Sequence, residues 1–245
     1  MWFKIELLCY ENYQGSKNKD FYMNIAQFID HTILKPTTTL ADIEKIYEEA
    51  AQYDFVAICI PPYYVSDARQ IAGEGKIKIA TVVGFPFGYS HYKAKLAETE
   101  RALQDGADEI DMVINLAAFK SNDVAYLENE IKEISDLTAS ATAILKVIIE
   151  SGILSEDEII KCCELYQHFP VQFLKTSTGY ADKGATLEAV QIMRKHLPPH
   201  IQKKASGGIK TYELAKQLID AGATRLGCSA GVAIVNGETG AAQGY

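Results

Sequence analysis

Two lysines end short apolar runs in this chain of 245 residues. Lys175 closes the run VQFLK, and Lys204 closes the run IQKK, which is followed by ASGG. An ammonium group taken out of water must be paired, hydrated or deprotonated. A deprotonated lysine beside a carbonyl compound is a nucleophile that forms a Schiff base. These two positions therefore indicate amine chemistry on a carbonyl substrate.

Two more charged residues lie inside apolar runs. The two-residue period of a strand places Asp111 on one face of the run 109–115 and Lys146 on one face of the run 144–150. For either residue alone, a buried ion pair or an outward-facing side chain is the simpler interpretation. Interior charges cost several kcal/mol each unless they are compensated. Together with the two lysines above, these residues predict one polar cluster with perturbed titration.

Such a cluster has the electrostatic means to activate an amine. Lowering a lysine pKa from about 10.4 to about 7 requires roughly 4.6 kcal/mol. A second ammonium group about 6 Å away, at an effective dielectric near 20, contributes roughly 2.8 kcal/mol. Partial desolvation must supply the remainder. Because Lys175 and Lys204 end consecutive predicted strands, we expect Lys204 to make the larger contribution.

Glycines follow the last three predicted strands. They lie in the segments 178–179, 206–208 and 227–229. Phosphate groups commonly bind in this region of an α/β barrel, where bare backbone amides and a helix N-terminus approach the ligand closely. Any one set could simply shape a turn. The three sets together favour a phosphate site.

From residue 24 onward, strand-like runs alternate with amphipathic stretches, as in parallel strands joined by helices. The predicted strands are Phe28–Asp30, Phe55–Ile60, Lys78–Val83, Glu109–Ile114, Ala143–Ile149, Val171–Lys175, Gln202–Ala205 and Thr224–Gly227. The predicted helices are Leu40–Gln52, Ala94–Asp105, Val124–Leu137, Ser155–Tyr166, Thr186–Lys195 and Tyr212–Ala221. Eight strands favour a single-domain α/β fold, the (β/α)8 TIM barrel, over an open doubly wound sheet. The active site is then expected at the C-terminal ends of the strands.

Composition narrows the class of protein. The chain has 32 acidic and 24 basic residues, a net charge of -8 and no long Lys/Arg cluster, so neither nucleic acid nor a membrane surface is an expected partner. No apolar run reaches the length of a membrane span. The five cysteines are odd in number and show no C-x-x-C spacing, which argues against a disulfide framework or a zinc site. We expect a reduced, cytoplasmic protein.

The two ends differ from the rest of the chain. Residues 1–22 are expected to be a poorly ordered extension, residues 23–238 the barrel domain, and residues 239–245 a flexible tail. No small-residue cleavage site follows the first apolar stretch, so a signal peptide is not expected. Met23 is a candidate start beside Met1.

The residues resemble one known family, the deoxyribose-phosphate aldolases, from Asn24 to Glu238. The matching segments are IDHTILKP (29–36), VAICIP (56–61), DEID (108–111), LKVIIE (145–150), FLKTSTG (173–179) and KASGG (204–208). The resemblance implies a class I aldolase without metal or cofactor. Such an enzyme reversibly cleaves 2-deoxy-D-ribose 5-phosphate to D-glyceraldehyde 3-phosphate and acetaldehyde through a lysine Schiff base. It also implies a role in deoxyribose phosphate catabolism and a homodimer.

Carried over by position, the resemblance assigns roles to individual residues. Lys175 matches the Schiff-base lysine, Asp111 the proton-relay carboxylate, and Lys204 the lysine that tunes the site. The implied substrate-binding residues are Asp30, Thr32, Cys59, Lys146, Thr178, Gly179, Gly207, Gly208, Gly227 and Ser229. Of these, Cys59 and Lys146 are expected to line the site without bonding covalently to the substrate.

Three positions depart from the family pattern. Tyr180 and Lys210 stand where some relatives carry lysine and arginine, so backbone amides are expected to dominate phosphate binding. Cys228 stands where threonine or alanine is commoner. Some members also end in a tyrosine that is thought to reach the active site. Tyr245 is a candidate for this role, although a flexible terminus is the simpler interpretation.

Other functions remain open from the sequence. A metal-dependent aldolase would need clustered ligands, whereas the five histidines are scattered and form no His-x-His pair. A Schiff-base aldolase acting on another phosphosugar is the main catalytic alternative. A non-catalytic phosphosugar-binding barrel is the alternative from another class, but it would not need to keep Asp111, Lys175 and Lys204 together.

Overall fold

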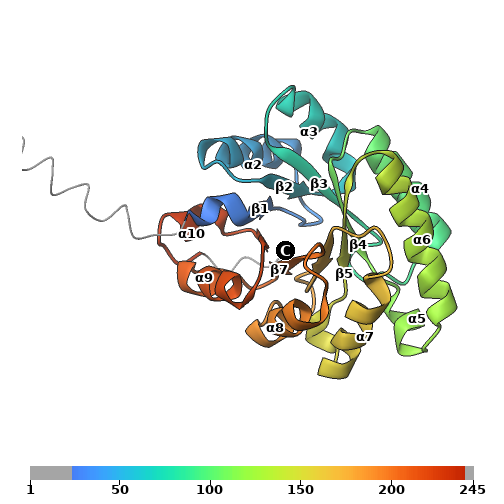
Figure 1. Ribbon diagram of the computed structural model, residues 1–245. Coiled ribbons are helices and arrows are strands. Elements are labelled where there is room, and N and C mark those ends of the chain that lie inside the picture. Colours follow the sequence, from blue (N-terminus) through green and yellow to red (C-terminus); the bar gives the residue numbers. More distant parts are fainter. Residues whose placement is uncertain (1–23, 241–245) are drawn as a thin grey trace, which may run out of the picture.

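The computed structural model describes residues 24–240, which form a closed barrel of eight parallel strands in chain order (Figure 1). Each strand pairs with the next, and β8 pairs back with β1. The strands are β1 Ile29–Thr32, β2 Ala57–Ile60, β3 Lys78–Val83, β4 Glu109–Val113, β5 Ile144–Ile148, β6 Phe173–Lys175, β7 Gln202–Ser206 and β8 Arg225–Cys228. The prediction of a single-domain (β/α)8 barrel is confirmed.

Helices surround the barrel and connect its strands (Figure 1). They are α2 Leu40–Gln52, α3 Val65–Ala72, α4 Tyr92–Gln104, α5 Leu116–Lys120, α6 Val124–Ser140, α7 Glu156–Tyr166, α8 Leu187–His196, α9 Tyr212–Ala221 and α10 Gly231–Val235, with short 3-10 helices at Ile25–Phe28, Pro62–Tyr64 and Ser151–Ile153. Capping boxes start α2 at Thr39 and α7 at Ser155, where side chain and backbone satisfy otherwise unpaired N–H groups.

Three helices were not predicted from the sequence: α3, α5 and α10. Each has eight residues or fewer, which is too short for a helical period to stand out. The predicted first strand was also too short, because β1 continues through His31 to Thr32. This extension brings Thr32 to the C-terminal end of the strand, where the site is expected.

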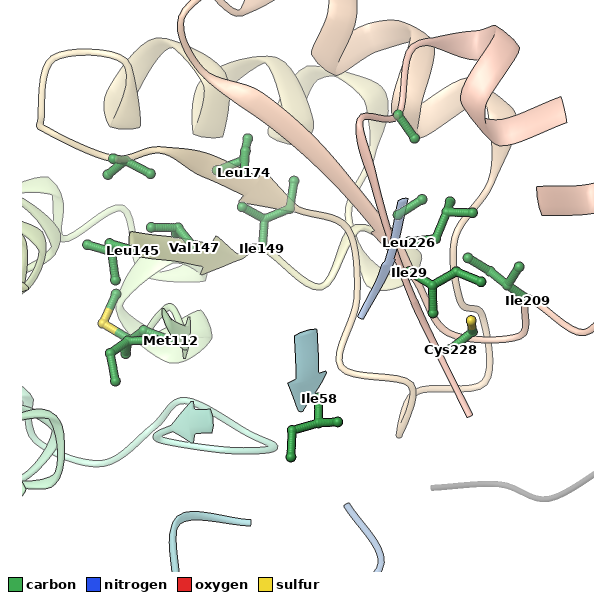
Figure 2. Close-up of a cluster of buried hydrophobic side chains, with 14 of the residues drawn as sticks. Ile29, Ile58, Met112, Leu145, Val147, Ile149, Leu174, Ile209, Leu226 and Cys228 are labelled. Carbon is green, nitrogen blue, oxygen red and sulfur yellow. The ribbon is translucent and has the colours of Figure 1, made fainter. Parts of the chain in front are cut away.

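Alternate residues of the strands face two different environments. The main hydrophobic cluster lies between the strands and the helices, and Figure 2 shows Val147, Leu174 and Leu226 among its members. A second, smaller cluster consists of Leu34, Cys59, Ala80 and Val82, with Phe85 packed against it. Because the period of a strand is two, the residues between the outward-facing ones point into the barrel. On the later strands these are largely charged.

Some predictions fall outside the described residues: the extension 1–22, the choice between Met1 and Met23, the tail beyond Gly240, and Tyr245. Within the described part of the chain, no helix is long and apolar enough to cross a membrane.

Candidate active site

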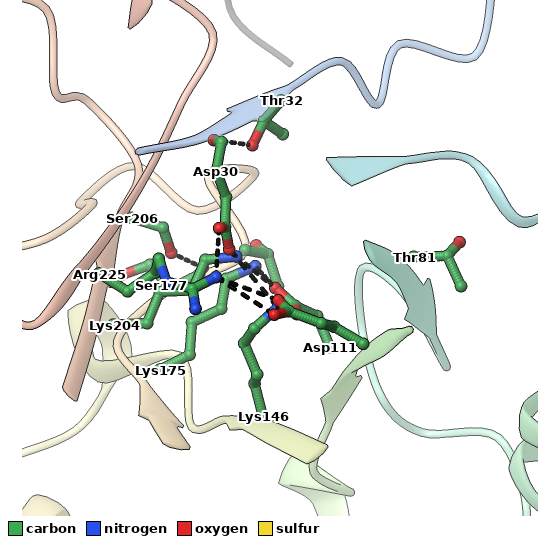
Figure 3. A network of polar contacts seen from close by, with 12 residues as sticks. Asp30, Thr32, Thr81, Asp111, Lys146, Lys175, Ser177, Lys204, Ser206 and Arg225 are labelled. Atoms are coloured by element: carbon green, nitrogen blue, oxygen red, sulfur yellow. Dashed lines mark hydrogen bonds and ion pairs between the residues drawn. The ribbon is translucent and has the colours of Figure 1, made fainter. Parts of the chain in front are cut away.

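Three lysines converge on one carboxylate inside the barrel (Figure 3). Asp111 Oδ1 accepts a hydrogen bond from Lys146 Nζ at 2.6 Å, and Asp111 Oδ2 accepts from Lys175 Nζ and Lys204 Nζ, both at 2.8 Å. Asp111, Lys146 and Lys204 are fully buried, and Lys175 is 2% exposed. The predicted polar cluster therefore forms, and it contains all four residues singled out in the sequence.

Strand register explains why these residues meet. Asp111 on β4 lies beside Lys146 on β5, and Lys175 on β6 lies beside Lys204 on β7. Inward-facing residues of neighbouring parallel strands are brought together in this way at each layer of a barrel.

A further set of charges extends the cluster. Asp30 on β1 accepts from Lys204 Nζ and from Arg225 Nη1, the latter at 2.6 Å. Arg225 also reaches Glu109 Oε2 at 3.1 Å, and Lys146 lies 2.6 Å from the same oxygen. Sequence reasoning assigned no role to Glu109 or Arg225. Glu109 could have been found from the sequence, because the two-residue period of β4 places it on the same face as Asp111. Arg225 could not, because it begins a strand of only four residues, which is too short to show a period.

The electrostatics distinguish the lysines. Burial lowers the pKa of Lys175, and the nearby Lys204 ammonium lowers it further against the opposing effect of Asp111. Burial acts on Lys204 in the same direction, but Asp111 and Asp30 together raise its pKa. The pKa of Lys146 is raised well above its usual value by its carboxylate partners, despite burial. Lys175 is thus the lysine of this cluster that loses its proton most easily.

The causes of the lowered pKa of Lys175 differ in order from the expectation. From the sequence, Lys204 was expected to make the larger contribution and desolvation the remainder. In the structure burial is the largest cause and Lys204 is secondary, because Lys175 is buried together with the rest of the cluster. Asp111 itself stays ionised: burial raises its pKa, but Lys146, Lys175 and Lys204 hold it well below the usual range.

A cavity of about 190 Å³, here called the glycine cavity, lies at the C-terminal ends of β6, β7 and β8. Its lining residues are Gly179, Ala181, Asp182, Gly184, Gly207, Gly208, Ile209, Lys210, Cys228 and Ser229. Gly207 has φ of 87° and Gly208 φ of 76°, a region that glycine adopts without strain. Four of the predicted phosphate-binding residues therefore share one cavity: Gly179, Gly207, Gly208 and Ser229.

Two further residues lie outside this cavity: Gly227, which was predicted to bind substrate, and Tyr180, which departs from the family pattern. Gly227 faces the charged cluster, where an added Cβ would come within 3.0 Å of the Lys204 side chain, so its small size accommodates Lys204. Tyr180 does not line the glycine cavity but crosses the barrel mouth. Its hydroxyl donates to Leu34 O at 3.0 Å, and its ring lies edge-on to Phe85 with centroids 5.4 Å apart.

Thr178 is held by a carboxylate that sequence reasoning did not select. Glu150 follows β5 with φ of 54°, and its carboxylate accepts from Thr178 Oγ1 and from Thr178 N at 3.2 Å. Thr178 Oγ1 in turn accepts from Tyr180 N at 3.0 Å. The hydroxyl of Thr178 is therefore committed within the protein. Likewise, Thr32 Oγ1 donates to Asp30 O at 2.9 Å.

The opposite side of the mouth is apolar. Cys59 is fully buried with Leu34, Ala80 and Val82, and burial raises the pKa of its thiol, which favours the neutral form.

A second cavity of about 620 Å³ lies beside β1, between α2 and α10, and its lining includes Thr32 and Ser229. Among residues 24–240, no group of three or more His, Cys, Asp or Glu residues is placed to hold a metal ion.

Comparison with known proteins assigns the chain to a family. A protein-family model described as "DeoC/LacD family aldolase" matches residues 24–237. The chain belongs to this family. The match contains every strand of the barrel and the strand ends at both cavities, and it confirms the resemblance to the deoxyribose-phosphate aldolases.

Individual relatives of this aldolase agree. A deoxyribose-phosphate aldolase of Thermococcus gammatolerans is 48% identical over 221 residues, covering 89% of this chain and 98% of that protein. One of Caldicellulosiruptor saccharolyticus is 47% identical over 213 residues, covering 86% and 97%. The solved structure of a tetrameric deoxyribose phosphate aldolase from Aeropyrum pernix has a TM-score of 0.81 and 30% identity, covering 86% of this chain and 89% of that one.

Proposed function

We propose that this aldolase reversibly cleaves 2-deoxy-D-ribose 5-phosphate to D-glyceraldehyde 3-phosphate and acetaldehyde through a Schiff base on Lys175. The observation that carries the proposal is the placement of Lys175: it is buried, has a lowered pKa and lies 2.8 Å from Asp111. A neutral amine in an aldolase barrel is the nucleophile that class I chemistry requires.

The reaction follows from this amine. Lys175 Nζ attacks the C1 carbonyl, and loss of water gives a protonated imine. The imine draws electrons from the C2–C3 bond, which breaks as the C3 hydroxyl loses its proton, so that D-glyceraldehyde 3-phosphate leaves and an enamine remains on Lys175. Protonation of the enamine at C2 and hydrolysis of the imine release acetaldehyde and the free lysine.

Asp111 and Lys204 are assigned to the proton transfers. Asp111 Oδ2 accepts from both Lys175 and Lys204, so one carboxylate links the reacting amine to a second amine. Lys204 has a raised pKa and keeps an ammonium beside the imine, and Asp111 stabilises the positive charge that develops on Lys175. Asp30 accepts a hydrogen bond from Lys204, and Lys146 donates one to Asp111, so these two residues orient the groups that transfer protons.

The glycine cavity is assigned to the phosphate of the substrate. Backbone amides from three βα loops meet there, and Ser229 and Lys210 add a hydroxyl and an ammonium group. Phosphate bound at β6–β8 places the sugar over Lys175 at the end of β6. The apolar wall with Cys59 and Leu34 then lies on the far side of the mouth. Thr32 and Thr178, at the ends of β1 and β6, are assigned positions near the sugar.

Reductive trapping tests the proposal. Incubation with 2-deoxyribose 5-phosphate and borohydride is expected to add one covalent adduct, which peptide mass spectrometry maps to Lys175. Lys175→Ala should give no adduct and no cleavage, while Lys78→Ala, at an exposed lysine at the opposite end of the barrel, should react as the parent does. A folded protein that binds the phosphosugar but forms no adduct would contradict the Schiff base. Cleavage of other phosphosugars at comparable rates would contradict the substrate.

Two coarser expectations complete the proposal. We infer a cytoplasmic enzyme of deoxyribose phosphate catabolism, which is supported by the free, buried state of the four described cysteines. We also expect a homodimer, and light scattering of the purified protein tests this, with a monomer or a tetramer as the contradicting outcome.

A further inference from the structure

Arg225 and Glu109 lie beneath the reacting lysine, at the N-terminal ends of their strands. Arg225 is the first residue of β8, and its guanidinium lies 5.1 Å from the ring centroid of Phe173. Phe173 and Lys175 are two residues apart on β6 and so point to the same side, into the barrel. Arg225 therefore lies deeper in the barrel than Lys175 and does not line the glycine cavity.

The charges of the connected cluster are unequal in number. It contains the basic residues Lys146, Lys175, Lys204 and Arg225 and the carboxylates Asp30, Glu109 and Asp111. Full ionisation would bury one excess positive charge, which is costly in a low-dielectric interior. The charges balance when one of the lysines is neutral.

The number of carboxylates near each lysine indicates which lysine is neutral. Among the carboxylates of the described residues, Lys175 lies within 4 Å of Asp111 alone and shares it with Lys146 and Lys204. Lys146 and Lys204 also reach Asp30, and Lys146 reaches Glu109. Arg225 stays charged in any protein environment and occupies Asp30 and Glu109 from below. Lys175 is consequently the least compensated cation.

We propose that Arg225 is a positioning residue that, by binding Asp30 and Glu109, keeps the cluster one positive charge in excess and so sets the pH at which Lys175 becomes nucleophilic. The inference rests on the proposed Schiff-base function of Lys175. It adds Arg225 and Glu109, which lie below the glycine cavity, to the neighbours on β4 and β7 that determine the protonation of Lys175.

Other groups near Lys175 do not alter the balance. The titratable and charged groups in the barrel interior around it are Asp30 on β1, Cys59 on β2, Glu109 and Asp111 on β4, Lys146 on β5, Glu150 after β5, Lys204 on β7 and Arg225 on β8. On β3 the buried residues of this side are Ala80 and Val82, and Lys78, which shares their face by period, is exposed at the opposite end of the strand. Burial raises the pKa of both Cys59 and Glu150, which disfavours a charge on either group. Among the described residues, Glu150 forms no ion pair within 4 Å with a lysine of the cluster, and its carboxylate accepts from Thr178 instead.

Arg225→Met tests the inference through the pH profile of retro-aldol kcat/KM. A unit charge removed from about 10 Å away shifts a pKa by roughly one unit at an effective dielectric near 20. Without the guanidinium, the acidic limb of the profile should move up by about one pH unit, while kcat/KM above the limb stays close to that of the parent. Arg225→Lys keeps the charge and should move the limb by less than half as much. A variant damaged only in its fold would lose activity at every pH.

Glu109→Gln provides the opposite charge change. It removes a carboxylate and should move the acidic limb to lower pH, and the double variant Arg225→Met/Glu109→Gln should return the limb to its original position. Unchanged limbs, or shifts of the two single variants in the same direction, would overturn the inference. Cyanoborohydride trapping of acetaldehyde on the parent protein is the separate check of function: if no adduct forms on Lys175, the proposed function fails whatever the profiles show.

Discussion

Lys175 lies in an environment that disfavours its own charged form. Its folded-state pKa is lowered from that of a free lysine, chiefly by burial. A cation with a lowered pKa subtracts stability at every pH below its unfolded value of about 10.4, because the unfolded chain then binds the proton more tightly than the folded chain does. The amine that makes the site reactive is therefore expected to make the barrel less stable.

Lys175→Met should abolish imine trapping and stabilise the protein at neutral pH. Methionine fills a similar volume without a charge, and Asp111 keeps Lys146 and Lys204 as partners. Calorimetry should show a higher Tm, by about 2–4 °C for each kcal/mol gained in a chain of this size. A lower Tm would mean that the ion pair with Asp111 outweighs the cost of burying the ammonium.

Lys146→Met is the matched comparison and should act in the opposite direction. Lys146 neutralises Asp111 and Glu109 at 2.6 Å each, and its pKa is raised well above the usual value. Its loss leaves Asp111 and Glu109 with one cationic partner fewer each, and breaking a buried ion pair by removing one partner typically costs about 3–5 kcal/mol. Chemical denaturation should show this decrease in the free energy of unfolding. Equal effects of the two substitutions would contradict the distinction between the two lysines.

At the scale of elements, period and pattern predicted much of the structure. The bounds of α2, α9 and β3 agree with the sequence prediction, and the two-residue period placed Asp111 and Lys146 in the interior. Short helices such as α3 have too few turns to show a period. Contacts between loops, such as that of Glu150 with Thr178, depend on how the strands close, and no local pattern reports them.

The turn after β5 braces the loop after β6. Glu150 adopts φ of 54°, which a non-glycine residue takes only when its surroundings hold it there, and the next residue, Ser151, donates its N–H to Thr176 O at 2.7 Å. Beside it, an added Cβ on Gly152 would come within 2.3 Å of Lys183 O. The two loops are therefore closely packed, and Glu150 fixes Thr178 at their junction.

Glu150→Ala should loosen this loop and weaken phosphate binding. Losing hydrogen bonds to a buried carboxylate costs about 1.5–3 kcal/mol, so KM for the phosphorylated substrate should rise by about tenfold or more. The KM for unphosphorylated 2-deoxyribose should change much less. Glu150→Gln keeps an acceptor oxygen for Thr178 and should therefore stay closer to the parent than Glu150→Ala does.

Two controls separate this effect from a general loss of structure. Asp108→Asn alters another carboxylate that accepts a backbone N–H, from Ile79 at 2.8 Å, at the opposite end of the barrel, and should leave the ratio of the two KM values unchanged. In a Thr178→Val background, Glu150→Ala should have a smaller effect, because the partner hydroxyl is already gone. Full additivity of the two substitutions would show that Glu150 acts by another route.

For the whole molecule, the barrel interior is divided by function. The strands β4 to β8 and β1 carry the charged cluster, β6 to β8 end in the glycine cavity, and β2 and β3 supply the apolar wall. Tyr180 connects these parts across the mouth through Leu34 and Phe85. The charged cluster, the glycine cavity and the apolar wall combine residues from strands that are distant in sequence. The complete site therefore forms only when the barrel is closed.

Closure of the barrel depends on a defined stretch of chain. The β1–β8 pairing joins Ile29 to Leu226, so the described strands from Ile29 to Cys228 close the ring among themselves. We therefore expect a chain that begins at Met23 to fold and to cleave 2-deoxyribose 5-phosphate with kcat/KM within about twofold of the full chain, and with a Tm within about 2 °C, which corresponds to less than roughly 1 kcal/mol. Side-by-side calorimetry and retro-aldol assays measure both. A large loss of Tm would show that the first 22 residues contribute to the barrel, whereas a loss of kcat/KM at unchanged Tm would place their contribution at the site.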